Sequence, residues 1–183
     1  MDRRENTREP FFSKQTVGRI ILFSLFIFLT AAFQASFFGA AGFFPATPDL
    51  LLAAVMGLAM FDGERTGAVC GLFAGVMADA LGGSGTLFMP LFYMLAGYVT
   101  GIAIRTFLTR NLLSWLVYML AGILFRGSVT FMYLTVFKRV YDVPLLLFRA
   151  VLPEALMTFV FSVPLYFVSK LCAKPFLRES ELE

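Results

Sequence analysis

The sequence contains no histidine, a single tryptophan and two cysteines, and only 15% of its 183 residues are charged. Histidine is the side chain best suited to acid–base work near neutral pH and the commonest metal ligand, so its absence removes the usual parts of a catalytic or zinc site. Cys70 and Cys172 stand far apart in apolar segments, which suits reduced, buried thiols better than a disulfide. We therefore expect neither an enzyme nor a metalloprotein, and no cofactor.

Apolar residues are abundant instead. They make up 59% of the chain, with 23 phenylalanines, and the mean hydropathy is +0.81. Ordinary soluble domains are about 45–50% apolar and about 25% charged. The formal net charge is +3, but the cations stand at the ends of apolar runs, where the positive-inside rule places them. The composition predicts one membrane domain and no nucleic-acid partner.

Six apolar runs divide the chain, and we expect an all-α integral membrane protein with six transmembrane helices. The expected helices cover residues 20–38, 48–61, 65–81, 86–107, 111–137 and 145–171, with Pro153 as an alternative start for the last. Thr47 is expected to cap the second helix, with Pro48 at its first helical position and Asp49 in its first turn. The second and third helices are short for a hydrocarbon core of about 30 Å, so we expect a hairpin shielded by longer neighbours.

The distribution of lysine and arginine predicts the orientation. Residues 1–16 form an expected N-terminal tail, residues 17–172 the six-helix membrane domain and residues 173–183 a C-terminal tail. With the N-terminus inside, most cations fall on inner segments, which favours cytoplasmic location of both termini. The inner cations are then Arg3, Arg4, Arg8, Lys14, Arg19, Arg65, Arg105, Arg110, Lys170, Lys174 and Arg178, against Lys138, Arg139 and Arg149 outside.

Glycines spaced four residues apart mark the third helix. Gly67, Gly71 and Gly75 lie on one helical face, and Gly97 and Gly101 repeat the spacing in the fourth helix. Glycine in a water-exposed helix costs about 1 kcal/mol relative to alanine. In a membrane the same residues let two helix backbones approach closely. We expect these five glycines to form a helix-packing ridge.

Four ionisable residues lie inside the expected helices: Asp49, Asp79, Arg126 and Glu154. At 1.5 Å per residue, all four fall roughly 20–24 Å from the inner end of their helices. Charges at one depth tend to pair, because an isolated charge in lipid is costly. We expect Arg126 to pair with Asp79 or Glu154.

This charged layer has several interpretations at the level of sequence. Asp49 and Glu154 would serve equally well as caps of their helices. An Asp79–Arg126 pair would be either purely architectural or part of a partner-binding or gating element, while no nucleophile–base pair supports catalysis.

Residues 48–101 resemble the rod shape-determining protein MreD family. The resemblance comprises a Pro-Asp-Leu helix start, a charged turn, a glycine ridge that ends in an aspartate, a glycine-rich loop and a Gly-Tyr pair. Outside this region it extends to length and hydropathy layout, with Pro153-Glu154 and Pro164 near the end. The matching positions are Pro48, Asp49, Gly71, Gly75, Asp79, Gly97 and Tyr98.

The resemblance implies a non-catalytic, multi-pass protein of the bacterial cell (inner) membrane that acts in cell elongation. Its implied partner is MreC, in a complex with the actin-like MreB, RodZ, the glycosyltransferase RodA and a penicillin-binding transpeptidase. Such a protein would help couple MreB filaments to peptidoglycan synthesis and maintain rod shape.

A second hypothesis comes from the similar architecture of the substrate-binding S components of energy-coupling-factor vitamin transporters. Those components dock through small residues spaced four apart on the first helix, a spacing that Ala31 and Ala35 share. This alternative predicts a small-molecule pocket at the charged layer and an ATPase module as partner.

Overall fold

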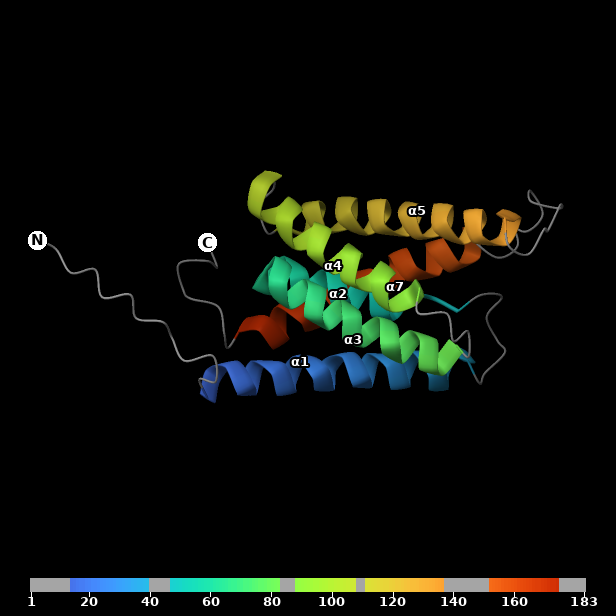
Figure 1. Ribbon diagram of the computed structural model, residues 1–183. Helices are drawn as coiled ribbons and strands as arrows, with labels where there is room; N and C mark the ends of the chain where they lie inside the picture. The colour runs from blue at the N-terminus through green and yellow to red at the C-terminus, as the bar shows by residue number, and fades with distance from the viewer. Residues whose placement is uncertain (1–13, 40–46, 83–87, 108–110, 137–151, 175–183) are drawn as a thin grey trace, which may run out of the picture.

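The computed structural model describes residues 14–39, 47–82, 88–107, 111–136 and 152–174, and its regular structure within these ranges is helical. Figure 1 shows α1 and α5 on opposite sides of the bundle, with α2 and α7 between them. The elements are α1 (Lys14–Phe33), the π-helix η1 (Gln34–Gly39), α2 (Leu50–Asp62), α3 (Glu64–Gly82), α4 (Phe88–Phe107), α5 (Leu112–Val136) and α7 (Leu152–Ala173).

Helix α2 is the centre of the core. Every residue from Leu50 to Phe61 is buried, so this helix has no exposed face. A helix that is apolar all round is stable only when other helices enclose it. Helices α1, α3, α4, α5 and α7 all pack against it.

The start of α2 differs from the sequence prediction. The N-cap is Asp49, whose side chain accepts a hydrogen bond from the Leu52 N–H at 3.1 Å. Gln34 Oε1 accepts from the N–H groups of Leu50 and Leu51 at 2.9 and 3.2 Å. The prediction of a Thr47 cap with Pro48 inside the helix is wrong. The helix begins two residues later than expected, because Asp49 and Gln34 together bind its first free N–H groups.

Glycines bring α3 and α4 into backbone contact along what we term the α3–α4 seam. A Cβ atom on Gly67 would lie 2.6 Å from the carbonyl oxygen of Gly97. A Cβ on Gly71 would collide with the backbone of Tyr93, and one on Gly75 with that of Pro90. At the far end of the seam, Gly101 lies against the backbone of Gly63 and Glu64. The small residues set the separation of these two helices.

Four helical segments in the described part of the chain are long and apolar enough to cross a membrane. They are Gly18–Phe38, Phe88–Thr106, Leu112–Met132 and Leu152–Ala173. Helix α2 is apolar but has only 13 residues, about 20 Å of rise. Helix α3 contains Glu64, Arg65 and Asp79, which lower its hydropathy, and it is not among the four. The structure thus supports a helical membrane protein, and spanning by α2 and α3 stays a prediction.

Helix α7 begins at Leu152, close to the alternative start at Pro153, while residues 145–151 lie outside the described ranges.

Two ion pairs join the helices at the end of the bundle where α2 finishes. Arg19 of α1 lies 3.1 Å from Asp62, and Arg105 of α4 lies 3.2 Å from Glu64. We call this the Asp62 end and the opposite one the Asp49 end.

Replacement of Gly71 by leucine is expected to disrupt the fold. The new side chain would collide with the backbone of Tyr93, and overpacking of a tight contact typically costs 1–3 kcal/mol. Gly18→Leu is the matched control, because a Cβ at Gly18 has no neighbour within 4 Å. Size-exclusion chromatography and thermal unfolding in detergent measure both variants. Equal, wild-type stability of the two would contradict a close α3–α4 seam.

Candidate functional site: a buried ion-pair network

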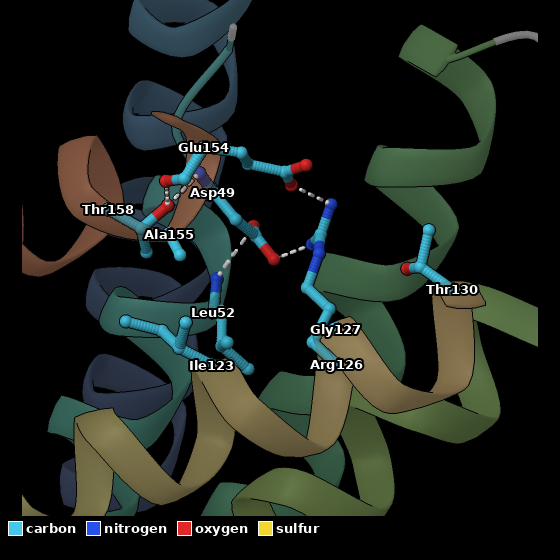
Figure 2. Close-up of a pocket in the computed structure, with 9 residues that line it drawn as sticks. All are labelled: Asp49, Leu52, Ile123, Arg126, Gly127, Thr130, Glu154, Ala155 and Thr158. Carbon is cyan, nitrogen blue, oxygen red and sulfur yellow. Dashed lines mark hydrogen bonds and ion pairs between the residues drawn. The ribbon is translucent and has the colours of Figure 1, made fainter. Parts of the chain in front are cut away.

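A polar network joins four helices at the Asp49 end of the bundle. Asp49 precedes α2, Tyr93 lies on α4, Arg126 on α5 and Glu154 in the first turn of α7. Figure 2 shows the guanidinium of Arg126 between the carboxylates of Asp49 and Glu154. Because its members come from helices far apart in the sequence, the network fixes how these helices lie relative to one another.

Asp49 is the most enclosed member, with 2% of its surface exposed. Its Oδ1 accepts from the Leu52 N–H and from the Tyr93 hydroxyl, the latter at 2.6 Å. Its Oδ2 forms an ion pair with Nη1 of Arg126. A buried carboxylate is tolerated when charges and hydrogen-bond donors surround it, and here they do.

Arg126 and Tyr93 complete the surroundings of that carboxylate. Nη1 of Arg126 donates to the Tyr93 hydroxyl at 2.9 Å, and Nη2 lies 2.8 Å from Glu154 Oε1. The Tyr93 hydroxyl therefore accepts from Arg126 while it donates to Asp49. A tyrosine buried among apolar side chains usually needs such a partner for its hydroxyl.

Thr158 links the loop before α2 to α7. Its Oγ1 accepts from the Asp49 N–H at 2.8 Å and donates to the Glu154 carbonyl oxygen at 2.7 Å. Figure 2 shows this hydroxyl between the two backbone groups. The N–H of Asp49 is thus bound by α7, and its side chain is bound by α4 and α5.

With both carboxylates ionised, the network carries one negative charge in excess, since Arg126 is its one cation. The side chains of Arg126 and Glu154 are 24% and 28% exposed, against 1% for Asp49. Glu154 is therefore the acid at the accessible rim of the network, and Asp49 lies behind it.

A small cavity of about 20 Å³ adjoins the network, lined in part by Thr130, Arg126 and Glu154. A cavity needs roughly 10–15 Å³ of probe volume to hold one water molecule. The space is therefore of water size, and its lining offers hydroxyl, guanidinium and carboxylate groups as partners.

Arg126 forms an ion pair with Glu154, which confirms one of its two expected pairings. In the described part of the chain its second ion pair is with Asp49, where the sequence predicted Asp79. Asp79 lies on α3, which packs against α1, α2 and α4, whereas α5 packs against α7 and α2. Equal depth along the helices does not imply adjacency around the bundle.

Sequence reasoning missed Tyr93, Thr158 and Gln34. Tyr93 stands in an apolar run, and a hydroxyl there is the one available signal, because it must find a hydrogen bond. The family resemblance pointed instead to Tyr98, which is 45% exposed. Among the described residues, no group of three or more cysteine, aspartate and glutamate side chains could hold a metal ion. The absence of a cofactor or metal remains a prediction.

Asp49→Asn is expected to destabilise the protein more than Glu154→Gln. Loss of one partner from a buried ion pair typically costs about 3–5 kcal/mol, and at the enclosed Asp49 position no water can replace the lost carboxylate beside Arg126. Glu154 is partly exposed, so water can substitute for its lost charge interaction. Thermal unfolding in detergent compares the variants, and Asp49→Asn combined with Arg126→Gln should recover part of the loss. A larger effect of Glu154→Gln would contradict this order.

Compared with protein-family models, curated proteins and solved structures, the chain matches none.

Proposed function

We propose that this chain is a non-catalytic membrane subunit of a bacterial cell-elongation complex, resembling MreD and binding MreC. MreB, RodZ, RodA and a penicillin-binding transpeptidase are its proposed associates in the cell membrane. The observation that supports this most is that residues of the MreD-like stretch carry the architecture. Asp49 is the enclosed centre of the ion-pair network, and Gly71, Gly75 and Gly97 lie in the α3–α4 seam.

The network is suited to recognition rather than to bond-breaking chemistry. Both oxygens of Asp49 already contact the protein, which leaves this carboxylate no free position for a substrate. Glu154 and Arg126 are the members that a partner can reach. With cytoplasmic termini, the Asp49 end would face the outer side. Because the network has an excess negative charge, a partner segment there should present a cation or a hydrogen-bond donor.

The transporter hypothesis predicts a vitamin-sized pocket at the charged layer. Small-molecule sites usually measure about 300–1,000 Å³. The cavity at the network measures about 20 Å³, enough for a water molecule. The cavity at the network is therefore too small for a vitamin, while an apolar cavity of about 460 Å³ between α4 and α5 keeps the S-component alternative open to the same experiment.

Affinity purification of the full chain from native membranes tests the two proposals against each other. We expect co-purification of a bitopic protein with the properties of MreC and of the cell-wall synthases. Recovery of an ATPase module without these proteins would contradict the proposal and support a transport component.

Glu154→Gln is expected to weaken capture of MreC while the level of the protein in the membrane holds. The substitution keeps the shape of the side chain and removes the accessible charge. Glu64→Gln is the matched control, because Glu64 is likewise a partly exposed partner of an arginine, but at the Asp62 end. Asp79→Asn is also expected to impair assembly more than expression. Quantitative capture, normalised to membrane protein level, measures all three; equal capture by Glu154→Gln and Glu64→Gln would argue against partner contact at the network.

A further inference from the structure

In the described part of the chain, the ion-pair network leaves one carboxylate oxygen without a cation. Asp49 and Glu154 share the single guanidinium of Arg126, so two negative charges face one positive charge. Arg126 binds Glu154 through Oε1, and the other polar contact of Glu154 among the described residues is made by its backbone carbonyl oxygen. Its second carboxylate oxygen, Oε2, is therefore available. An unmatched charge between apolar helices is costly, so a further cation at Oε2 would stabilise the network.

The cavity beside the network is the space that such a cation would enter. Helix α5 lines it with Arg126, Gly127 and Thr130, and α7 lines it with Glu154 and Ala155. Figure 2 shows these side chains from the two helices around the guanidinium. The partial exposure of Arg126 and Glu154 means that a group from outside the bundle can reach them. The hydroxyl of Thr130 adds a second oxygen acceptor to the lining.

The size and the lining of the cavity indicate the chemical class of the cation. Its volume is about 20 Å³, which is room for a group the size of one water molecule. A primary ammonium is compact and donates three hydrogen bonds, whereas a guanidinium is a wide planar fork. A calcium ion takes 6–8 oxygen ligands, and the Asp49 carboxylate and the Thr158 hydroxyl in the lining already have partners. The cavity therefore suits a primary ammonium group.

The depth of the cavity indicates where the ammonium comes from. Helix α5 continues from Arg126 to Val136, a rise of about 15 Å towards its outer end. A lipid headgroup would have to descend through most of that distance to reach Glu154. A lysine on a transmembrane helix carries its ammonium on a flexible four-carbon stem, and the position of the residue in the helix sets its depth. Lysine is therefore the better source.

We propose that Glu154 and Thr130 form a primary-ammonium site that receives a lysine from a transmembrane segment of the partner. The ammonium donates to Oε2 of Glu154 and to Oγ1 of Thr130. Asp49, Arg126, Glu154 and the lysine then form a row of alternating charges with no net charge. This inference rests on the proposed function for the presence of a partner at the network, and it adds which side chain of the partner binds there. It does not require that the partner is MreC.

The site is tested without any partner, with methylammonium as the probe. Thermal unfolding of the full chain in detergent is compared in equal concentrations of methylammonium chloride and tetramethylammonium chloride. The second cation has the same charge, but it is larger and has no N–H donor. We expect methylammonium to raise the unfolding midpoint by a few degrees, because a ligand that binds only the folded state stabilises it. Equal midpoints in the two salts would overturn the site.

Substitutions locate the methylammonium effect. Glu154→Gln should abolish the rise in midpoint, while Glu64→Gln should keep it, because Glu64 pairs with its arginine at the Asp62 end. Ala155→Leu fills the cavity without changing a charge and should also abolish the rise. Thr130→Val removes one acceptor and should reduce it. Monodisperse elution in size-exclusion chromatography establishes that each variant is folded. A full rise in Ala155→Leu would overturn the cavity as the binding position.

Carbodiimide coupling in native membranes tests the source of the ammonium. The reagent activates a carboxylate, which then forms an amide with a primary amine in contact with it. We expect mass spectrometry to find Glu154 joined to a lysine of a membrane protein. Glu64 is the matched control and should form no such amide, because its side chain is 25% exposed, against 28% for Glu154, and its partner is an arginine.

The outcomes separate this inference from the proposed function. An amide between Glu154 and an aminophospholipid, or a methylammonium effect without any Glu154–lysine amide, would overturn the lysine. A Glu154–lysine amide to a protein other than MreC would support the ammonium site and contradict only the proposed partner.

Discussion

The cost of burying the Asp49 carboxylate governs this structure. An isolated ionised group in an apolar interior is prohibitively expensive, so the chain must bring donors and a cation to it. It does so with the Leu52 N–H, the Tyr93 hydroxyl and the Arg126 guanidinium, taken from three different helices. Apolar contacts in a membrane environment discriminate weakly between alternative helix arrangements. The single requirement of one carboxylate therefore selects the arrangement of α2, α4 and α5.

The α3–α4 seam solves a complementary problem. The network orients helices through hydrogen bonds and ion pairs. In the seam, glycines without side chains set the distance between the α3 and α4 backbones. Helix α4 belongs to both systems, because Tyr93 contributes its hydroxyl to Asp49 and its backbone to the contact with Gly71. A shift of α4 along α3 would displace the hydroxyl from the carboxylate. The packing of glycines and the geometry of the charged network are therefore coupled through one residue.

Much of this architecture follows from patterns in the sequence. Hydropathy located most helix ends to within two residues, although α1 begins six residues before its expected start, and depth along each helix brought Arg126 together with Glu154. Depth could not say that Asp49 would be the second ion-pair partner of Arg126, because that depends on the order of the helices around the bundle. The role of Gln34 was equally inaccessible. It follows from the π-helical turn at the end of α1, which carries its amide oxygen to the N–H groups of Leu50 and Leu51.

The long sequence separations within the network bear on how the protein is made. Asp49 and its hydrogen-bond partner Thr158 are 109 residues apart, and Arg126 is also synthesised long after α2. As α2 leaves the ribosome it is apolar on every face, and Asp49 at its start does not yet have its cation Arg126. Until α5 and α7 have been inserted, α2 is stable only where the Asp49 carboxylate contacts water or is protonated. Helix α7, which is synthesised after the other described helices, thus completes the environment of Asp49, and a chain that stops before α7 leaves Asp49 without Thr158 and Glu154 around it.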